Sequence, residues 1–207
     1  MSYSKCSIIG YSGHGLVVAE AAKLSGLPLS FYTDLSAKSE NPYQLKYIGD
    51  ESIESFQYWD SNYAYVLGIG DNAVRVKCAQ NVLSKGRELV NVIHPDACIS
   101  AEVTFGQGNF FSRNCAINPM VKIGDFCILN TSCVVEHHCL LGDGVHVAPG
   151  AVLLGNVHVG AGSFIGANSV VKQGVKIGEN VIIGAGAVVL KDVGHGKTIV
   201  GNPGRIL

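Results

Sequence analysis

Residues 135–153 read VEHHCLLGDGVHVAPGAVL, and in this stretch an apolar residue returns at every sixth position. The spacing continues in both directions without an exception, from Ile99 to Val189. A period of six fits neither the 3.6-residue turn of an α-helix nor the two-residue alternation of a strand. It is typical of short strands joined by sharp corners, where glycine can adopt a positive φ. The positions are Ile99, Phe105, Phe111, Ile117, Ile123, Leu129, Val135, Leu141, Val147, Leu153, Val159, Ile165, Val171, Ile177, Ile183 and Val189.

A second series lies four residues after each apolar position and consists mostly of small side chains, such as Cys133 and Ala151. Glycine often follows the apolar residue directly, as at Gly124 and Gly142. Three six-residue units would close one triangular coil, and stacked coils would bury their apolar positions against neighbouring coils. We therefore predict that residues 94–207 form a parallel β-helix, with the apolar series in its shaft and the small series where space is limited.

Residues 1–93 show a different pattern, in which strand-like and helix-like segments alternate. Strands are expected at 5–10, 29–33, 63–69 and 89–93, and helices at 16–24 and 73–85. This alternation predicts a small parallel sheet and hence a Rossmann-like domain. About 90 residues provide only half of a dinucleotide-binding sheet, which favours a mononucleotide or a nucleotide-sugar over NAD as its ligand.

The carboxyl ends of the predicted strands carry the candidate ligand-binding residues. Residues 10–15 read GYSGHG, which departs from the dinucleotide fingerprint Gly-x-Gly-x-x-Gly. The N–H groups of this loop and of the helix that follows it would attract a phosphate. Asp34 follows the second strand, where its carboxylate could accept a hydrogen bond from ribose or uracil. The alternative is that the loop and the acid only shape a turn.

Charge and cysteine content limit the classes of partner. The 15 Lys and Arg residues nearly balance the 16 Asp and Glu residues, so we expect a small-molecule partner rather than nucleic acid or a membrane surface. No apolar run is long enough to span a membrane, and Met1–Lys5 lack the basic and apolar regions of a signal peptide. The chain has seven cysteines, an odd number, and those of the repeat occupy small positions without Cys-x-x-Cys spacing. We predict a reduced, cytoplasmic protein without a metal site.

One cluster of titratable residues interrupts the repeat, namely Glu136, His137 and His138, with His146 shortly after. A neutral imidazole can accept a proton from an amine or a hydroxyl near neutral pH. His137 lies two places after an inward residue, at a corner that should be exposed, and is the candidate base. Glu136, Asp125, Asp143 and Asn130 stay open as the group that orients it.

The positions of His137 and His146 bear on the oligomeric state. The two residues are nine positions apart, which is half a coil, so they should point to different sides of one prism. They could converge only from separate subunits. The interpretation of the pair as one site therefore requires an oligomer, and three prisms packed side by side would provide it.

Five further features of the sequence are short segments: GYSGHG at 10–15, IGDN at 69–72, IHP at 93–95, NTSCVVEH at 130–137 and VGNP at 200–203. Together these segments resemble the hexapeptide-repeat acetyltransferases of bacterial surface-sugar synthesis. The resemblance is strongest to the left-handed β-helix enzymes that N-acetylate UDP-4-amino-sugars on the route to bacillosamine, and it extends over nearly the whole chain. Sialic acid O-acetyltransferases and GDP-perosamine N-acetyltransferases look similar at the same places.

The resemblance implies transfer of an acetyl group from acetyl-CoA to the amino group of a nucleotide-linked sugar, in a homotrimer with active sites between subunits. It implies His137 as the base, and Glu136, His138 and Asn130 are the further catalytic candidates. In the bacillosamine-type relative a glutamate follows the catalytic histidine, where this chain has His138. The implied acetyl-CoA contacts are His146, Ala167 and Ala185, and the implied nucleotide-sugar site is Ser12, Gly13, His14, Asp34 and Gly70.

Other functions fit parts of the same pattern. A zinc hydratase of the γ-carbonic anhydrase kind would use three histidines, but His137, His138 and His146 lack the spacing of that family. A non-catalytic trimer that binds a nucleotide-sugar would use the β-helix only for assembly. A sialic acid O-acetyltransferase would share the fold. The identity of the nucleotide, whether UDP, GDP or TDP, stays open.

Overall fold

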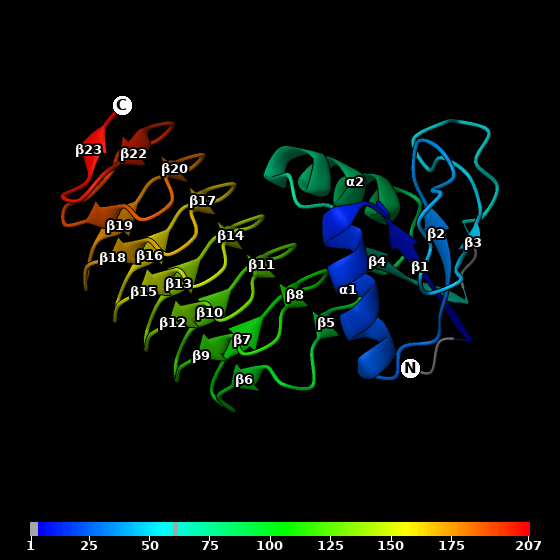
Figure 1. Cartoon of the computed structure of the whole chain (residues 1–207), viewed down its shortest axis with the longest axis horizontal. Coiled ribbons are helices and arrows are strands. Elements are labelled where there is room, and N and C mark those ends of the chain that lie inside the picture. The colour runs from blue at the N-terminus through cyan, green and yellow to red at the C-terminus, as the bar shows by residue number, and fades with distance from the viewer. Residues whose placement is uncertain (1–3, 60–61) are drawn as a thin grey trace. The chain divides into compact units, whose positions relative to one another are not determined.

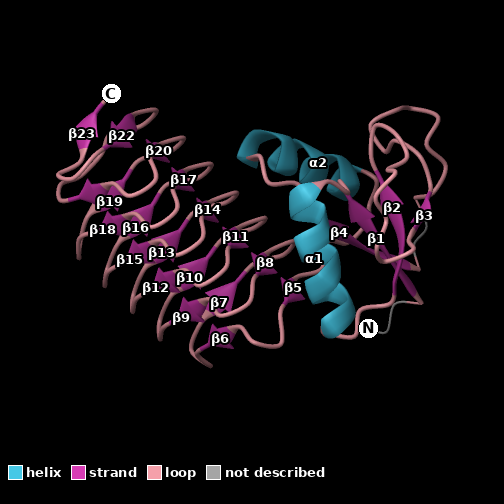
Figure 2. Cartoon of the chain, viewed as in Figure 1, coloured by secondary structure: helices cyan, strands magenta, loops and turns pink. Residues whose placement is uncertain are grey.

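The computed structural model describes residues 4–59 and 62–207, and the chain divides into two units between Pro95 and Asp96. Residues 1–3, which precede the first predicted strand, lie outside this description, as do residues 60 and 61. Both helices of the described residues belong to the N-terminal unit, and the C-terminal unit consists of strands and turns (Figure 2). The predicted fold class, a Rossmann-like domain followed by a parallel β-helix, is confirmed.

The N-terminal unit is built on a four-stranded parallel sheet with the order β3-β2-β1-β4. The strands predicted at 5–10, 29–33 and 63–69 and both predicted helices are present, and the structure adds the short edge strand β3, which pairs with β2. The prediction of a further strand of this sheet at 89–93 is wrong, because only Val92–Ile93 is a strand, it is not part of this sheet, and Leu89 forms only an isolated bridge to Tyr65. The elements are β1 Lys5–Ile9, α1 Gly13–Leu24, β2 Leu29–Thr33, β3 Lys46–Tyr47, β4 Tyr63–Leu67, α2 Asn72–Ser84 and β5 Val92–Ile93.

Glycine allows α1 to begin close to the sheet. A Cβ atom on Gly15, in the first turn of α1, or on Gly68, just after β4, would overlap the carbonyl oxygen of Gly10. Three backbone segments therefore meet at the carboxyl ends of β1 and β4 with no side chain between them. This is the edge at which a parallel sheet of this type binds its ligand.

The C-terminal unit is a solenoid in which each coil takes eighteen residues, because Lys122 pairs with Leu140 and Leu140 with His158. Its strands form three parallel sheets, one for each side of the coil (Figure 1). The first sheet holds β6 Cys98–Ile99, β9 Ala116–Ile117, β12 Val134–Val135, β15 Val152–Leu153, β18 Val170–Val171 and β21 Val188–Val189. The second holds β7 Thr104–Phe105, β10 Lys122–Ile123, β13 Leu140–Leu141, β16 His158–Val159 and β19 Lys176–Ile177. The third includes β8 Phe110–Phe111, β11 Ile128–Leu129, β14 His146–Val147, β17 Phe164–Ile165, β20 Ile182–Ile183, β22 Thr198–Val200 and the antiparallel β23 Arg205–Ile206.

The second residue of each strand from β6 to β21 is the apolar residue of the six-residue series. From Phe111 onward these side chains are all buried, whereas Ile99 is half-buried and Phe105 is 37% exposed. Phe105 lies in β7, the terminal strand of its sheet, so it has a neighbouring coil on one side only. Asn109 occupies a small inward position because its side chain accepts a hydrogen bond from the Cys127 N–H and donates one to the Gly124 carbonyl.

The corners of the coil differ from the prediction in one respect. A positive φ occurs at every sixth residue from Gly108 to Gly186, two places after the glycines that directly follow the apolar series. Those glycines, such as Gly142 and Gly160, do not have a positive φ; a Cβ on either would lie 2.7 or 2.6 Å from the backbone of the next coil. Close stacking of coils, rather than turn conformation, explains them. The left-handed position itself is usually Gly or Asn, and at His138 it is a histidine with a φ of 61°.

Candidate active site

His137 lies in the turn between β12 and β13, where its side chain is exposed. Its Nδ1 atom is 3.1 Å from Nδ1 of His138, and the planes of the two rings meet at 85°. One of these nitrogens donates and the other accepts, according to the tautomers. If His138 accepts, His137 carries its hydrogen on Nδ1 and presents the lone pair of Nε2 to a substrate. The pair can therefore hold a neutral imidazole in the form required of a general base.

The other residues considered as orienting groups lie elsewhere. Asp125 accepts a hydrogen bond from the Gln107 N–H, and Asp143 accepts one from the Asp125 N–H, so both carboxylates tie successive coils together in the turns between the second and third sheets. The Asn130 side chain bonds to His146, at a distance of 3.1 Å between Nδ2 and Nε2. Glu136 is half-buried and its N–H donates to the carbonyl of Leu153.

His146 is the first residue of β14 and is only 7% exposed. Its ring meets Phe164 of the next coil edge to face, at 5.0 Å between centroids, and Asn130 contacts it from the preceding coil. Ala167 and Ala185 follow on the next two coils, each in the turn that leaves the third sheet, and the Ala167 carbonyl accepts from the Gly186 N–H. The three residues implied as acetyl-CoA contacts thus occupy one side of the solenoid, and His137 lies in a turn between the other two sheets.

The cysteines next to the histidines are buried thiols. Cys133 and Cys139 are fully buried in the shaft, and burial raises the pKa of Cys139 to about 11 and that of Cys133 well above the usual value for a thiol. A thiol in this state carries almost no thiolate near neutral pH and is a poor nucleophile. The imidazoles, rather than these thiols, are therefore the candidates for chemistry at this corner.

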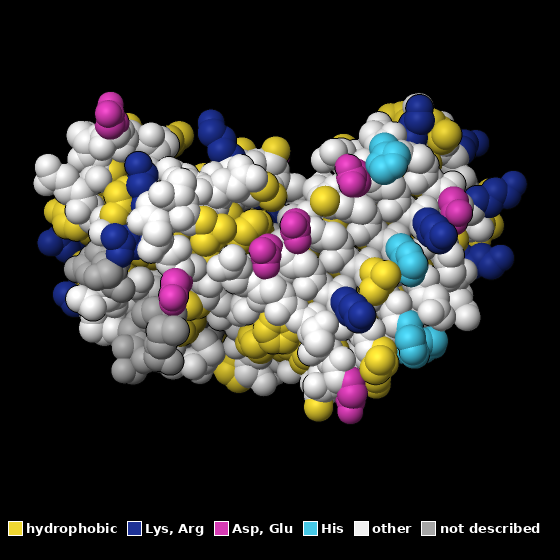
Figure 3. Space-filling view, turned by 180° about the vertical axis from the view of Figure 1, so that it is seen from behind, with side chains coloured by type: hydrophobic (Ala, Val, Ile, Leu, Met, Phe, Trp, Pro, Cys, Tyr) yellow, Lys and Arg dark blue, Asp and Glu magenta, His cyan; other side chains and the backbone are white. Residues whose placement is uncertain are grey.

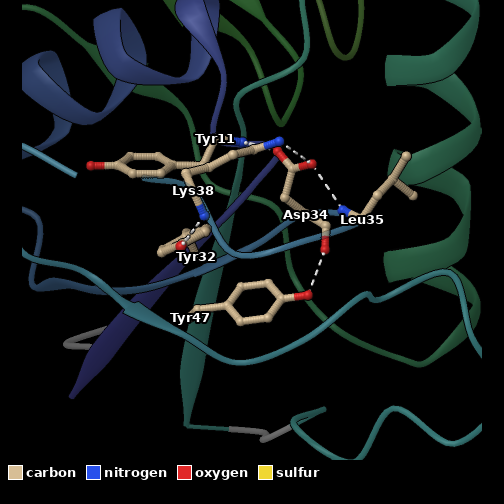
Figure 4. Close-up of polar contacts among 6 residues, drawn as sticks. All are labelled: Tyr11, Tyr32, Asp34, Leu35, Lys38 and Tyr47. Carbon is tan, nitrogen blue, oxygen red and sulfur yellow. Dashed lines mark hydrogen bonds and ion pairs between the residues drawn. The ribbon is translucent and has the colours of Figure 1, made fainter. Parts of the chain in front are cut away.

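In the N-terminal unit, Asp34 follows β2 and organises the loop after β1 (Figure 4). Its Oδ2 atom accepts from the Tyr11 N–H at 2.9 Å, and its Oδ1 atom accepts from the Leu35 N–H and forms an ion pair with Lys38 at 2.8 Å. Partial burial alone would raise the pKa of Asp34, but the Lys38 ammonium and the two N–H donors outweigh it, so the pKa is lowered. The carboxylate is therefore ionised, and it fixes the loop that holds Ser12 and Gly13.

Ser12 is the N-cap residue of α1, and Gly13 and His14 begin the helix, so their N–H groups lie at its positive end. His14 is packed against Gly70, whose Cβ position would be 3.5 Å from Cβ of His14. Burial, together with the charge of Arg75, lowers the pKa of His14 to about 4. His14 is therefore neutral near neutral pH. The structure brings Ser12, Gly13, His14 and Gly70 together at the sheet edge.

Arg75 and Lys38 were not identified from the sequence. Arg75 is 1% exposed and donates to the carbonyl oxygens of Ile69 and Gly70 and to Oδ1 of Asn72, so it fixes the loop after β4. Nothing in its sequence context separates it from an ordinary exposed arginine of a helix. Lys38 does have a signal, because it stands four residues after Asp34 with opposite charge.

The described residues, 4–59 and 62–207, contain no group of three or more His, Cys, Asp or Glu side chains that could hold a metal ion. Neither helix within them has the length and apolar character that crossing a membrane demands.

Comparisons with known proteins agree with the arrangement of the two units. The model of the PglD N-terminal domain matches residues 5–82, and the model of the bacterial transferase hexapeptide, with six repeats, matches residues 120–155 and 156–191.

Solved structures are similar over almost the full length. The acetyltransferase domain of PglB from Neisseria gonorrhoeae is 32% identical, with a TM-score of 0.92 over 98% of this chain and 99% of that domain. PerB from Caulobacter crescentus, in complex with CoA and GDP-perosamine, is 33% identical, with a TM-score of 0.89 over 99% of this chain and 97% of PerB. WeeI from Acinetobacter baumannii is 28% identical, with a TM-score of 0.79 over 99% of this chain and all of WeeI (100%).

A parallel nucleotide-type sheet followed by a six-residue-repeat solenoid, with an exposed histidine pair at one corner, defines the class of hexapeptide transferases. Within this class, the chain belongs to the family of hexapeptide-repeat acetyltransferases with a PglD-type N-terminal domain. The resemblance seen in the sequence is confirmed.

Proposed function

We propose that this protein transfers the acetyl group of acetyl-CoA to the amino group of a nucleotide-linked amino sugar. The observation that carries the proposal is the exposed imidazole of His137, whose Nδ1 is within hydrogen-bond distance of His138 and whose Nε2 is left for a substrate. PerB, which is similar over nearly the whole chain, binds CoA and GDP-perosamine, and the PglB domain binds acetyl coenzyme A. These relatives support both substrates.

The reaction proceeds by direct attack on the thioester. The sugar nitrogen bonds to the carbonyl carbon of acetyl-CoA while Nε2 of His137 takes the proton that the nitrogen loses. The tetrahedral intermediate then collapses, the carbon–sulfur bond breaks, and the CoA sulfur leaves with the proton returned by His137. The products are the N-acetylated sugar and free CoA thiol. His138 acts as a positioning residue in this scheme, because it sets the tautomer of His137 and accepts a hydrogen bond from the imidazolium.

We assign the nucleotide-sugar to the N-terminal unit and acetyl transfer to the solenoid. Ser12, Gly13 and His14 present N–H groups at the start of α1, a position that favours a phosphate. Neutral His14 adds no charge to this site. Asp34 would act chiefly through the loop that it fixes, although Oδ2, which accepts from the Tyr11 N–H, keeps a further lone pair for a sugar hydroxyl or a base N–H.

The same proposal includes a homotrimer with acetyl-CoA between subunits. The first residues of the strands in the first sheet are all apolar and form a face, here called the valine face: Cys98, Ala116, Val134, Val152, Val170 and Val188. Four valines in line on adjacent strands are typical of a sheet that packs on another chain. Three copies that meet through this face would bring the His137 turn of one copy toward a neighbour.

The second sheet has a different outer surface, the lysine face, formed by Thr104, Lys122, Leu140, His158 and Lys176. Lys, His and hydrophobic side chains follow one another in a row along the solenoid, with acidic side chains in a neighbouring row (Figure 3). An open groove of about 570 Å³ runs along this face, lined by β10, β13, β16 and β19 and by the glycines that follow the first three of these strands. Its lysines suit an elongated ligand with phosphate groups, such as the cofactor.

We place the enzyme in a reducing compartment, the cytoplasm. All seven cysteines are free thiols, and five of them, Cys6, Cys115, Cys127, Cys133 and Cys139, are buried. Disulfides are rare in cytoplasmic proteins, and thiols used as small apolar side chains are compatible with that environment.

A substrate panel tests the proposal. The protein is incubated with acetyl-CoA and, separately, with UDP-, GDP- and dTDP-linked amino sugars and free sialic acid, and thiol release is followed. We expect release with at least one nucleotide-linked amino sugar, and a loss of about 10²- to 10⁴-fold in kcat for His137→Ala. Activity on sialic acid alone, or full activity of His137→Ala, would reject the proposal.

A further inference from the structure

Gly155 lies one coil beyond His137, in the turn between β15 and β16 at the same corner of the solenoid. A Cβ atom built on Gly155 would be 2.6 Å from Cε1 of His137, 2.7 Å from Nε2 and 3.3 Å from Nδ1. Real Cβ atoms essentially never approach another heavy atom below 3.0 Å. The imidazole of His137 therefore occupies the space that the side chain of any other residue at position 155 would need.

The backbone gives no other reason for a glycine at this position. Gly155 does not have a positive φ; in this turn the left-handed residue is Asn156, with a φ of 58°. The glycines that allow coils to stack, such as Gly142 and Gly160, would meet backbone atoms of the next coil. At Gly155 the three nearest atoms all belong to the ring of His137. The absence of a side chain is thus matched to this ring.

We propose that Gly155 is a positioning residue for His137, an inference that rests on the proposed function of His137 as the base. His138 fixes the Nδ1 side of the ring through the 3.1 Å contact, and Gly155 lets the Cε1–Nε2 edge lie close to the next coil. The two contacts together determine where the lone pair of Nε2 is held. A base must be placed to within a fraction of an ångström of the proton that it accepts.

The variant Gly155→Ala tests this assignment. To reach a contact of 3.4 Å from 2.6 Å, Cε1 must move by about 0.8 Å, and the new methyl group also lies against Nε2. The atoms that give way are at the far end of a flexible side chain, so the coil keeps its structure. We expect kcat to fall about 10- to 100-fold, with the KM of each substrate within about twofold. The melting temperature should change by less than about 3 °C.

Gly194→Ala is the matched control. Gly194 also lies in the solenoid, has no positive φ, and has open space where its Cβ would be, so kcat and the melting temperature should stay at the wild-type values. Wild-type kcat in Gly155→Ala would overturn the inference.

A double-mutant cycle separates an effect on the ring from damage to the coil. In the His137→Ala background the ring is gone, so Gly155→Ala should cause no further loss of kcat. If the two losses multiply instead, Gly155 acts through the coil and the assignment is wrong. If His137→Ala alone keeps full activity, the proposed function fails, whatever the effect of Gly155→Ala. A kcat that falls in His137→Ala and stays unchanged in Gly155→Ala rejects only the role of Gly155.

Discussion

His138 adopts a left-handed backbone conformation, and this explains how two consecutive residues can face each other. In an extended strand the side chains of neighbours point to opposite faces. The turn at His138, with a φ of 61°, instead brings its Nδ1 to 3.1 Å from Nδ1 of His137. A histidine takes this conformation less readily than glycine or asparagine, which occupy most of the equivalent turns. The contact with His137 is a reason for its presence.

This pair can be tested with two substitutions that suit the same backbone. His138→Asn keeps an acceptor oxygen near the position of Nδ1, and His138→Gly removes it, while both residues are used at left-handed positions elsewhere in the solenoid. We expect His138→Asn to retain kcat within about threefold. His138→Gly should lose about 10- to 100-fold, the size expected for a hydrogen bond to a charged group. Steady-state kinetics with acetyl-CoA measure kcat for the two variants. Equal kcat values would contradict a positioning role for His138.

At the scale of elements, the stability of the unit that contains α1 depends on the protonation state of His14, in the first turn of this helix. The folded-state pKa of His14, about 4, lies below the 6.5 that is usual for a histidine, because of burial and of the nearby Arg75. The unfolded chain therefore binds a proton at a higher pH than the folded one. The stability associated with neutral His14 is fully present above about pH 6.5 and is lost as the pH falls toward 4.

We predict that lowering the pH from about 7.5 to about 5 destabilises the N-terminal unit by about 2 kcal/mol through His14 alone. The only tryptophan, Trp59, packs on Phe56 and Tyr65 in this unit, so its fluorescence during urea unfolding reports the change. His14→Gln removes the titration and leaves the carboxylates as they are. Between these two pH values, the free energy of unfolding of His14→Gln should fall by about 2 kcal/mol less than that of the wild type. An identical pH dependence in both proteins would contradict the role of His14.

The sequence predicts the elements of the two units unequally well, for physical reasons. The solenoid strands follow from the six-residue period, because every coil repeats the same burial pattern. β3 was missed, since Lys46–Tyr47 has two residues and exists only through its pairing with Phe31 and Tyr32. The histidine pair was also missed, because strand alternation does not apply inside a turn. Gly155 could have been identified from the sequence, because it follows His137 by eighteen residues, which is the length of one coil.

At the scale of the whole molecule, two of the three outer faces of the solenoid differ in chemistry. The valine face is apolar in every coil, and the lysine face carries both charged and apolar side chains. Exposing an apolar sheet face to water costs free energy, and packing it on another chain recovers roughly 25 cal/mol for each Å² buried. His137 and His146 lie on different sides of one chain, so a site that they share requires a neighbour. The positions of the histidines favour an oligomer, and the apolar surface favours the valine face as its interface.

Substitution on each face tests this assembly. Val152 is half-buried in the middle of the valine face, and a carboxylate there would be forced against its counterparts in the other two chains. We expect Val152→Asp to shift the mass in solution, measured by light scattering, from three chains to one. Thiol release should fall with it, since the proposed site lies between two chains. Leu140→Asp places the same charge on the lysine face, where the side chain is 38% exposed, and should remain trimeric. A trimeric Val152→Asp protein would exclude the valine face as the interface, and a wild-type protein that is monomeric would exclude the trimer itself.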